Sequence, residues 1–183
     1  MNPLNESFEE FKIENAEDLS WNEVNHLMPI GKVVEVMDPI SKIRWRMKRT
    51  YGKLHADMEP LDQSDTNAIK KAFGLADNYN DAPYHKVIVK IDERYIIGAF
   101  MTFPHQGSDK HEFWDLVDPN ELTGYSTDKD DDAIHPKKKL LPNMNSIKDN
   151  GVVGHMCLYF KGSSQHTTWL PNKKIDRVIN KNL

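Results

Sequence analysis

One stretch, Gly154-His155-Met156-Cys157-Leu158-Tyr159-Phe160, decides how the rest of the chain can be arranged. We interpret it as a short β-strand, whose side chains alternate between two faces. One face would carry three apolar side chains, those of Met156, Leu158 and Phe160. The other face would carry three groups capable of proton transfer, metal binding or nucleophilic attack, those of His155, Cys157 and Tyr159. We therefore expect one face in the core and the other in a functional site. The alternative is a half-buried strand whose polar face is only hydrogen-bonded.

The composition limits the classes of protein that the chain can belong to. Its 183 residues predict a single domain that is long enough for a substantial core. A hydrophobic fraction of 38% and a charged fraction of 28% are typical of a globular protein in water. The formal net charge of -4 argues against general nucleic-acid binding, which usually needs a basic surface. The single cysteine excludes an internal disulfide and a zinc site made of several cysteines, so a metal would need His with Asp or Glu.

The sequence shows no targeting or membrane-spanning segment. No apolar run approaches the roughly 20 residues that a membrane helix requires. The first residues have neither the basic region nor the apolar stretch of a signal peptide. We therefore expect no membrane partner. The chain as it stands predicts a cytoplasmic protein, or one of the cell envelope or secreted if it is a domain of a longer protein.

Two further pairs of strands are predicted before the strand at 154–160. Residues 32–37 and 42–50 form the first hairpin, because Asp38-Pro39-Ile40-Ser41 between them has the composition of a turn. Residues 86–91 and 95–103 form the second. The segment 95–101 is apolar on both faces, which predicts a central place in the sheet.

Three short helices complete the predicted fold. The first covers 21–28 and begins with a capping box, Ser20 with Glu23. The second covers 66–73, with Ser64 or Asp65 as its N-cap and Gly74 after its end, and the third covers 172–180. The order of elements leaves no room for a repeated β-α-β unit. We therefore expect an α+β fold, with a curved, mostly antiparallel sheet or small open barrel of about five strands.

The predicted domain is flanked and interrupted by segments without regular pattern. Residues 1–19 are acidic and rich in Asn, and we interpret them as a flexible arm before a single domain at 20–183. The stretch at about 108–145 is too long for an ordinary connection. We expect it to form a lid or a mobile loop.

Other residues capable of chemistry lie near the ends of predicted strands. His55 and Asp57 are two residues apart, so in an extended segment they point the same way. That arrangement suits shared metal ligation, or an Asp that orients a His. His105 follows the strand at 95–103, and His166 lies in the turn-rich loop after 154–160.

Several ordered motifs resemble those of one poorly characterised bacterial domain family. Lys48-Arg49-Thr50-Tyr51-Gly52 with His55-Ala56-Asp57-Met58-Glu59-Pro60-Leu61 resembles its first block. The other blocks of the family are resembled by Asp65-Thr66, Phe103-Pro104-His105, Ile147-Lys148-Asp149-Asn150-Gly151, the strand at 154–160, and Ser163 to His166. The family commonly occurs in secreted proteins beside peptidoglycan-binding or SH3-type modules. The resemblance covers about 19–178 and implies a role in the cell wall by association.

The chain departs from the family pattern at Tyr159, where the family usually has a second histidine. The family also accepts Asp at the position of Cys157, which argues against an obligatory thiol nucleophile, because Asp cannot do thiolate chemistry. Both Cys and Asp can ligate a metal. Tyr159 would point its hydroxyl into the site and donate a hydrogen bond to a substrate carbonyl or an oxyanion.

The leading hypothesis is a metal-assisted hydrolase that acts on peptidoglycan peptides or a related bond. His55, Asp57 and His155 would hold zinc and leave one position open for water. His105 or His166 would act as general base or stabilise the oxyanion.

Two alternatives remain at this point. One is an enzyme of the L,D-transpeptidase type with Cys157 as nucleophile, although the Ser-x-Gly-Cys-x-Arg signature is absent. The other is a protein without catalysis that binds a small anionic or nucleotide-like ligand between Arg49, the histidines and the lid. The expected partner is thus a peptidoglycan fragment or another small molecule.

Overall fold

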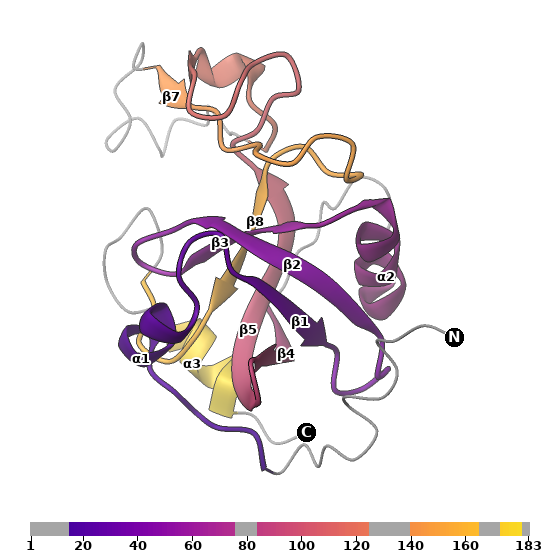
Figure 1. The fold of residues 1–183 in the computed structure, drawn as a ribbon, viewed down its shortest axis with the longest axis vertical. Helices are drawn as coiled ribbons and strands as arrows, with labels where there is room; N and C mark the ends of the chain where they lie inside the picture. Colours follow the sequence, from indigo (N-terminus) through magenta and orange to yellow (C-terminus); the bar gives the residue numbers. More distant parts are fainter. Residues whose placement is uncertain (1–14, 76–83, 125–139, 165–172, 181–183) are drawn as a thin grey trace.

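The computed structural model describes residues 15–75, 84–124, 140–164 and 173–180. Six antiparallel strands form a closed barrel in the order β1-β2-β3-β8-β5-β4 (Figure 1). Their bounds are β1 Val33–Met37, β2 Arg44–Tyr51, β3 Ala56–Pro60, β4 Tyr84–Ile91, β5 Arg94–His105 and β8 His155–Tyr159. Three α-helices accompany the barrel, which confirms the predicted α+β class and small barrel.

The barrel contains both predicted hairpins, β1–β2 and β4–β5. As predicted, β5 lies inside the sheet, between β4 and β8. The sheet closes because β1 also pairs with β4, from Glu35 opposite Lys90 to Met37 opposite Ile88. The sixth strand is β3, which contains Asp57 and links β2 to β8.

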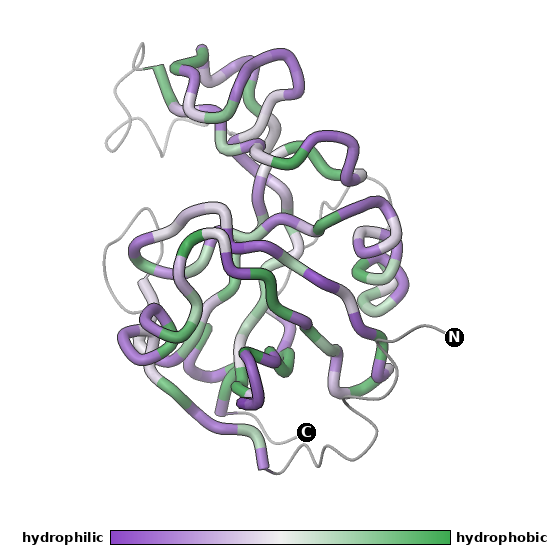
Figure 2. The backbone as a smooth tube through the Cα atoms, viewed as in Figure 1, coloured by the Kyte–Doolittle hydropathy of each residue, from purple (hydrophilic) through white to green (hydrophobic). Residues whose placement is uncertain are grey.

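The interior of the barrel is the main hydrophobic core. It contains the large side chains of Trp45, Met47, Met58, Phe100, Met156 and Leu158. Figure 2 shows hydrophobic and hydrophilic residues mixed along the barrel strands, as expected where one face of a strand is in the core and the other is not. The predicted alternation in β8 is confirmed, because Met156, Leu158 and Phe160 belong to this core. Cys157 and Tyr159 instead face outward and pack in a second cluster with helix α3.

Two of the helices contribute side chains to the barrel core, and the third packs on the outer face of the barrel. In α1 (Trp21–Leu27) the predicted capping box is present, and Trp21 stacks on Phe160 at 6.2 Å. Helix α2 (Gln63–Phe73) ends at Gly74 with a left-handed φ of 62°, as expected. Helix α3 (Lys173–Asn180) buries Ile175 and Ile179.

The predicted N-cap of α2 was wrong. Its N-cap is Asp62, whose side chain accepts hydrogen bonds from the backbone N–H groups of Ser64 and Asp65, so the helix begins three residues earlier than expected. The Asp65 carboxylate is directed away from the helix end and pairs with Arg46 at 2.9 Å. Asp65 thus serves a contact with a distant strand and not the helix cap, and the local sequence pattern does not reveal this.

A small unit stands beyond the ends of β5 and β8, at the top of Figure 1. This outlying unit consists of residues 107–124 and 140–145, and includes β6 (Leu116–Val117), a 3₁₀ turn (Pro119–Glu121) and β7 (Leu141–Pro142). The buried Asn143 holds it together, accepting from Ser108 N at 2.8 Å and donating to the carbonyls of Ser108, His111 and Glu112. These residues are the described part of the segment expected to be a lid or mobile loop.

The predicted arm is partly ordered against the barrel. The backbone of Glu17 bonds Tyr95 O and Ile97 N at 2.8 and 2.9 Å, and its carboxylate pairs with Arg94. Residues 1–14 lie outside the described residues. Among the described helices, none combines the length and apolar character needed to cross a membrane.

Candidate metal centre

The candidate centre lies on the outer face of the barrel, where β3, β8 and β5 run side by side. Asp57 is opposite Cys157, and Cys157 is in turn opposite Met101 of β5. Because Met58 and Met156 point into the barrel, Asp57 and Cys157 must point outward. Both are buried, with 1% and 0% of their surface exposed. The register therefore brings together two groups that are far apart in the sequence.

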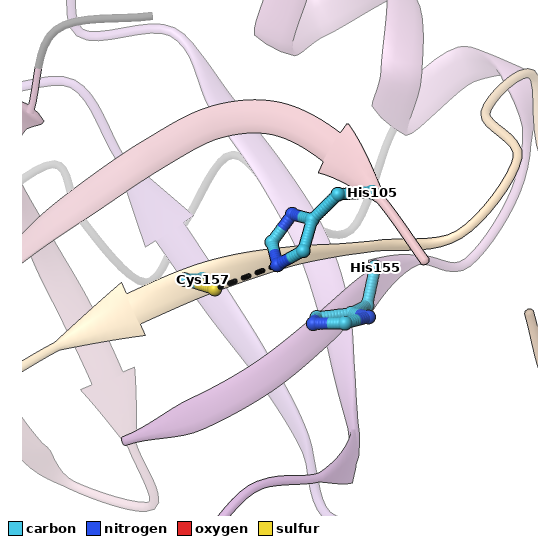
Figure 3. A group of neighbouring side chains, drawn as sticks. All are labelled: His105, His155 and Cys157. Atoms are coloured by element: carbon cyan, nitrogen blue, oxygen red, sulfur yellow. Dashed lines mark hydrogen bonds between the residues drawn. The ribbon is translucent and has the colours of Figure 1, made fainter. Parts of the chain in front are cut away.

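His105 reaches this face through an irregularity in β5. Between Met101 and His105 the β5–β8 register shifts, so that His105 lies opposite His155. The two imidazole rings are 4.1 Å apart on the same side as Cys157 (Figure 3). Pro104 has no N–H to donate to the ladder, which explains why the pairing is interrupted there.

Backbone carbonyls fix the tautomers of two histidines. His105 Nδ1 lies 3.0 Å from Phe103 O, and His55 Nδ1 lies 2.7 Å from Ser164 O. A carbonyl can only accept, so the proton of each neutral ring is on Nδ1. Each Nε2 then directs a lone pair into the cluster, His105 toward Cys157 Sγ at 3.6 Å and His55 toward Asp57 Oδ1 at 3.3 Å.

The two separations between histidine nitrogens and the Asp57 carboxylate are compatible with a shared cation. His55 Nε2 is 3.3 Å and His155 Nε2 is 3.6 Å from Asp57 Oδ1, whereas the 3.6 Å between His105 Nε2 and Cys157 Sγ is ordinary for a hydrogen bond that involves sulfur. An N–H···O bond is usually about 2.7–3.2 Å. Tetrahedral zinc, with bonds of about 2.0–2.3 Å, places N and O ligands about 3.4 Å apart and N and S ligands about 3.6 Å apart. A lone pair facing a carboxylate oxygen is repulsive unless a proton or a metal cation lies between them.

Among the residues that the structure describes, two sets of three donors are close enough to hold a metal ion. One is His55, Asp57 and Cys157, and the other is His105, His155 and Cys157. In each set the donor atoms all lie within 4.8 Å of one another. Cys157 belongs to both, so it occupies the centre of the group.

Burial keeps the thiol and the phenol neutral in the absence of a cation. It raises the pKa of Cys157 well above its usual value, and the negative charge of Asp57 raises it further. Burial also raises the pKa of Tyr159, whose ring packs 4.3 Å from that of His55. As a neutral phenol, Tyr159 can donate a hydrogen bond but cannot serve as a base near neutral pH.

The structure gathers most of the predicted site residues. Of the three predicted ligands, His55 and His155 each have Nε2 within 3.6 Å of the same Asp57 oxygen. Among the described residues these three are not one of the sets whose donors all lie close enough to hold an ion, and Cys157 takes the place of His155 beside His55 and Asp57. His105, Cys157 and Tyr159 adjoin them. His166 lies outside the described residues, so its predicted role remains a prediction.

Arg49 has a different environment from the one that ligand binding requires. Its side chain is buried, and its guanidinium donates to the carbonyls of Met28, Tyr51 and Gly52. It also lies 4.8 Å from the centre of the Trp21 ring. These contacts anchor the backbone at the end of β2 and give no support to a role in binding an anion.

The sequence reasoning missed Glu59, a carboxylate on the same face of β3 as Asp57. It is fully buried and accepts hydrogen bonds from the backbone N–H groups of Ser146 and Ile147. Burial raises its pKa to about 7 despite these donors. The alternation of His55, Asp57 and Glu59 was the signal that could have revealed it.

Comparison with known proteins adds no relative. No protein-family model, curated protein or solved structure matches the chain. The resemblance to the bacterial family therefore stays a prediction, and function has to be argued from the cluster itself.

Proposed function

We propose that the cluster binds zinc and that the protein is a metal-assisted hydrolase. The supporting observation is that the donor atoms of His55, Asp57 and Cys157 all lie within 4.8 Å of one another, and that the contact of His55 Nδ1 with Ser164 O turns His55 Nε2 toward Asp57. Imidazole, carboxylate and thiolate together are a donor set that zinc accepts. The resemblance to a family associated with the cell wall makes peptidoglycan peptides the first substrates to test.

The deeper set, His55, Asp57 and Cys157, is the better place for the ion. All three side chains are essentially inaccessible, whereas His105 is partly exposed. Catalytic zinc sites commonly use three protein ligands and keep one position open. Zinc bound in this way would lower the pKa of a bound water and polarise a substrate carbonyl.

The two remaining histidines then have roles in proton transfer and orientation. His105 is the more accessible, and it can accept a proton at Nε2 while Nδ1 keeps its bond to Phe103 O. His155 packs against the His105 ring and contacts Asp57, so it would position both. This arrangement moves His155 from ligand to neighbouring group relative to the first hypothesis.

Metal analysis of untagged protein tests the proposal. Wild type should carry about one zinc ion per chain. Asp57→Asn should lose it, because a neutral amide binds zinc much more weakly than a carboxylate does. Asp92→Asn changes an exposed aspartate in the β4–β5 turn and is the matched control. Muropeptide hydrolysis, followed by mass spectrometry, should stop with a chelator and return with zinc. Equal metal content in Asp57→Asn and the control would contradict the proposal.

A second candidate is a cysteine enzyme, favoured by the contact of Cys157 Sγ with His105 Nε2. Cys157 would be the nucleophile and His105 the base, and the Phe103 carbonyl orients the His105 ring, which is the arrangement that thiol catalysis uses. Against it, burial raises the pKa of the Cys157 thiol, so the reactive thiolate is disfavoured.

Cys157→Asp separates the two candidates. Aspartate can ligate zinc but cannot replace a thiol nucleophile. If the metal proposal is correct, this variant keeps metal and part of its activity, and the wild-type thiol reacts slowly with iodoacetamide at neutral pH. Full loss of activity with metal retained, together with rapid alkylation of wild type, would favour the cysteine enzyme.

A further inference from the structure

Trp114 of the outlying unit has a strained backbone. Its φ is +74°, in the left-handed region, which is unfavourable for a bulky side chain. The other non-glycine residues with positive φ among the described ones are Lys42, Asp92, Gln106 and Asp149. The strain is maintained by the unit around it, since Trp114 N–H donates to Asn143 O at 2.8 Å. Strain of this kind, held by surrounding structure, is common where a side chain is positioned for a ligand.

The indole forms an exposed aromatic corner with Tyr51. The two rings are 4.8 Å apart and meet at 89°, and 45% of the Trp114 surface is exposed. Tyr51 is the cross-strand partner of Asp57 in the β2–β3 pair. Cross-strand partners share a face of the sheet, with Cβ atoms about 4.5–5.5 Å apart. The Tyr51–Trp114 corner therefore adjoins the candidate metal centre.

The groups around the corner define the kind of ligand that fits. Glu112 and Asp115 are exposed carboxylates on either side of Trp114 in the sequence, and one Asp115 oxygen accepts from Glu112 N at 2.9 Å. Carboxylates accept hydrogen bonds from hydroxyl groups and repel anions. A pyranose ring offers an apolar C–H face to the aromatic rings and hydroxyl groups at its edge. An apolar peptide side chain would satisfy the rings alone.

We propose that the Tyr51–Trp114 corner binds a neutral saccharide ring beside the metal centre. Saccharide binding itself depends only on the Tyr51–Trp114 corner. The assignment of this corner as a subsite for the substrate rests on the proposed hydrolase function. The substrate class would then include a glycan portion next to the bond that is cleaved.

Titration with tri-N-acetylchitotriose tests the proposal on the full chain in the presence of a chelator. Binding is followed by the NMR signals of the indole N–H groups and by thermal melting. Trp114→Gly should weaken binding at least about fivefold, Trp114→Phe less, and Leu116→Ala not at all. Leu116 is a matched control because it lies in the same unit and is 65% exposed. Asp57→Asn should bind the saccharide as wild type does, so this test is independent of the metal.

Glycine tolerates positive φ, so Trp114→Gly relieves the backbone strain at this position. If Trp114 serves to bind a ligand and not to pack, the melting temperature of this variant should be unchanged or higher. A lower melting temperature in that variant, with Trp114→Phe binding like wild type, would show a packing role and overturn the proposal. Absence of saturable binding to wild type, or equal binding by wild type and Trp114→Gly, would also overturn it.

Discussion

Glu59 should make the stability of this protein depend on pH in an unusual direction. Its burial raises the carboxyl pKa from 4.5 to about 7, although the N–H groups of Ser146 and Ile147 and the Thr50 hydroxyl favour the ionised form. The desolvation of the charge therefore exceeds the gain from these donors. Because the folded pKa is the higher one, the folded state binds more protons than the unfolded state between these two values.

The stabilisation from Glu59 is therefore fully present below pH 4.5 and is lost as the pH rises through about 7. At about 1.4 kcal/mol for each pH unit, the loss amounts to about 3 kcal/mol. Glu59→Gln removes the titrating group and keeps one oxygen that can accept from the Ser146–Ile147 backbone. The free energy of unfolding of this variant, minus that of wild type, should rise by about 3 kcal/mol between pH 4.5 and 8.

Urea unfolding with a chelator present measures this difference without any contribution from bound metal. Glu93→Gln, an exposed position in the β4–β5 turn, is the matched control and should parallel wild type at every pH. Parallel curves for Glu59→Gln and wild type would refute the reasoning. They would mean that the backbone donors compensate the buried charge completely.

Three further predictions concern the candidate centre. Zinc at about 1,000 times its Kd should stabilise the fold by about 4 kcal/mol and raise Tm by roughly 8–16 °C in calorimetry; no rise in wild type, or the same rise in Asp57→Asn, would contradict the site. Tyr159→His should raise zinc affinity or muropeptide turnover, while Tyr159→Phe should lower the free energy of unfolding by no more than about 1 kcal/mol. If the His variant changes neither metal content nor turnover, the polar residues on the outer face of β8 have a structural role only. Gly52→Ala should destabilise the fold by more than about 2 kcal/mol and weaken zinc binding, because φ is +99° there and a Cβ would lie 2.1 Å from His55 O; unchanged melting would refute this contact.

The sequence allowed the local arrangement of the fold to be predicted, but not the contacts between distant strands. The alternation in β8 correctly assigned Met156 and Cys157 to opposite faces of the strand, because successive side chains point to opposite sides and only one side faces the barrel interior. The register that places Asp57 opposite Cys157 joins positions 100 residues apart, and no local pattern encodes it. The N-cap at Asp62 was missed for the same reason, because Asp65 had a distant partner in Arg46.

Arg49 shows how alternation could have been applied further. It has the same parity as Trp45 and Met47, whose side chains fill the barrel, so the alternation places its side chain inside as well. A buried guanidinium needs acceptors, and the carbonyls of Met28, Tyr51 and Gly52 supply them. Interpreting Arg49 as a ligand-binding residue ignored that periodicity.

Closure of the barrel explains why the candidate centre can exist at all. Strand β3 has partners on both sides, β2 and β8, so the backbone around Asp57 is fixed by two ladders. On the far side of β8, β5 advances four positions from Met101 to His105 while β8 advances only two between Cys157 and His155. The extra length carries His105 to the level of His155, and Phe103 O then orients its ring. Three neighbouring strands, with His55 directly before β3, thus bring their donors to one place on the outer face of the barrel, and the ladders on both sides of β3 and β8 hold the backbone there.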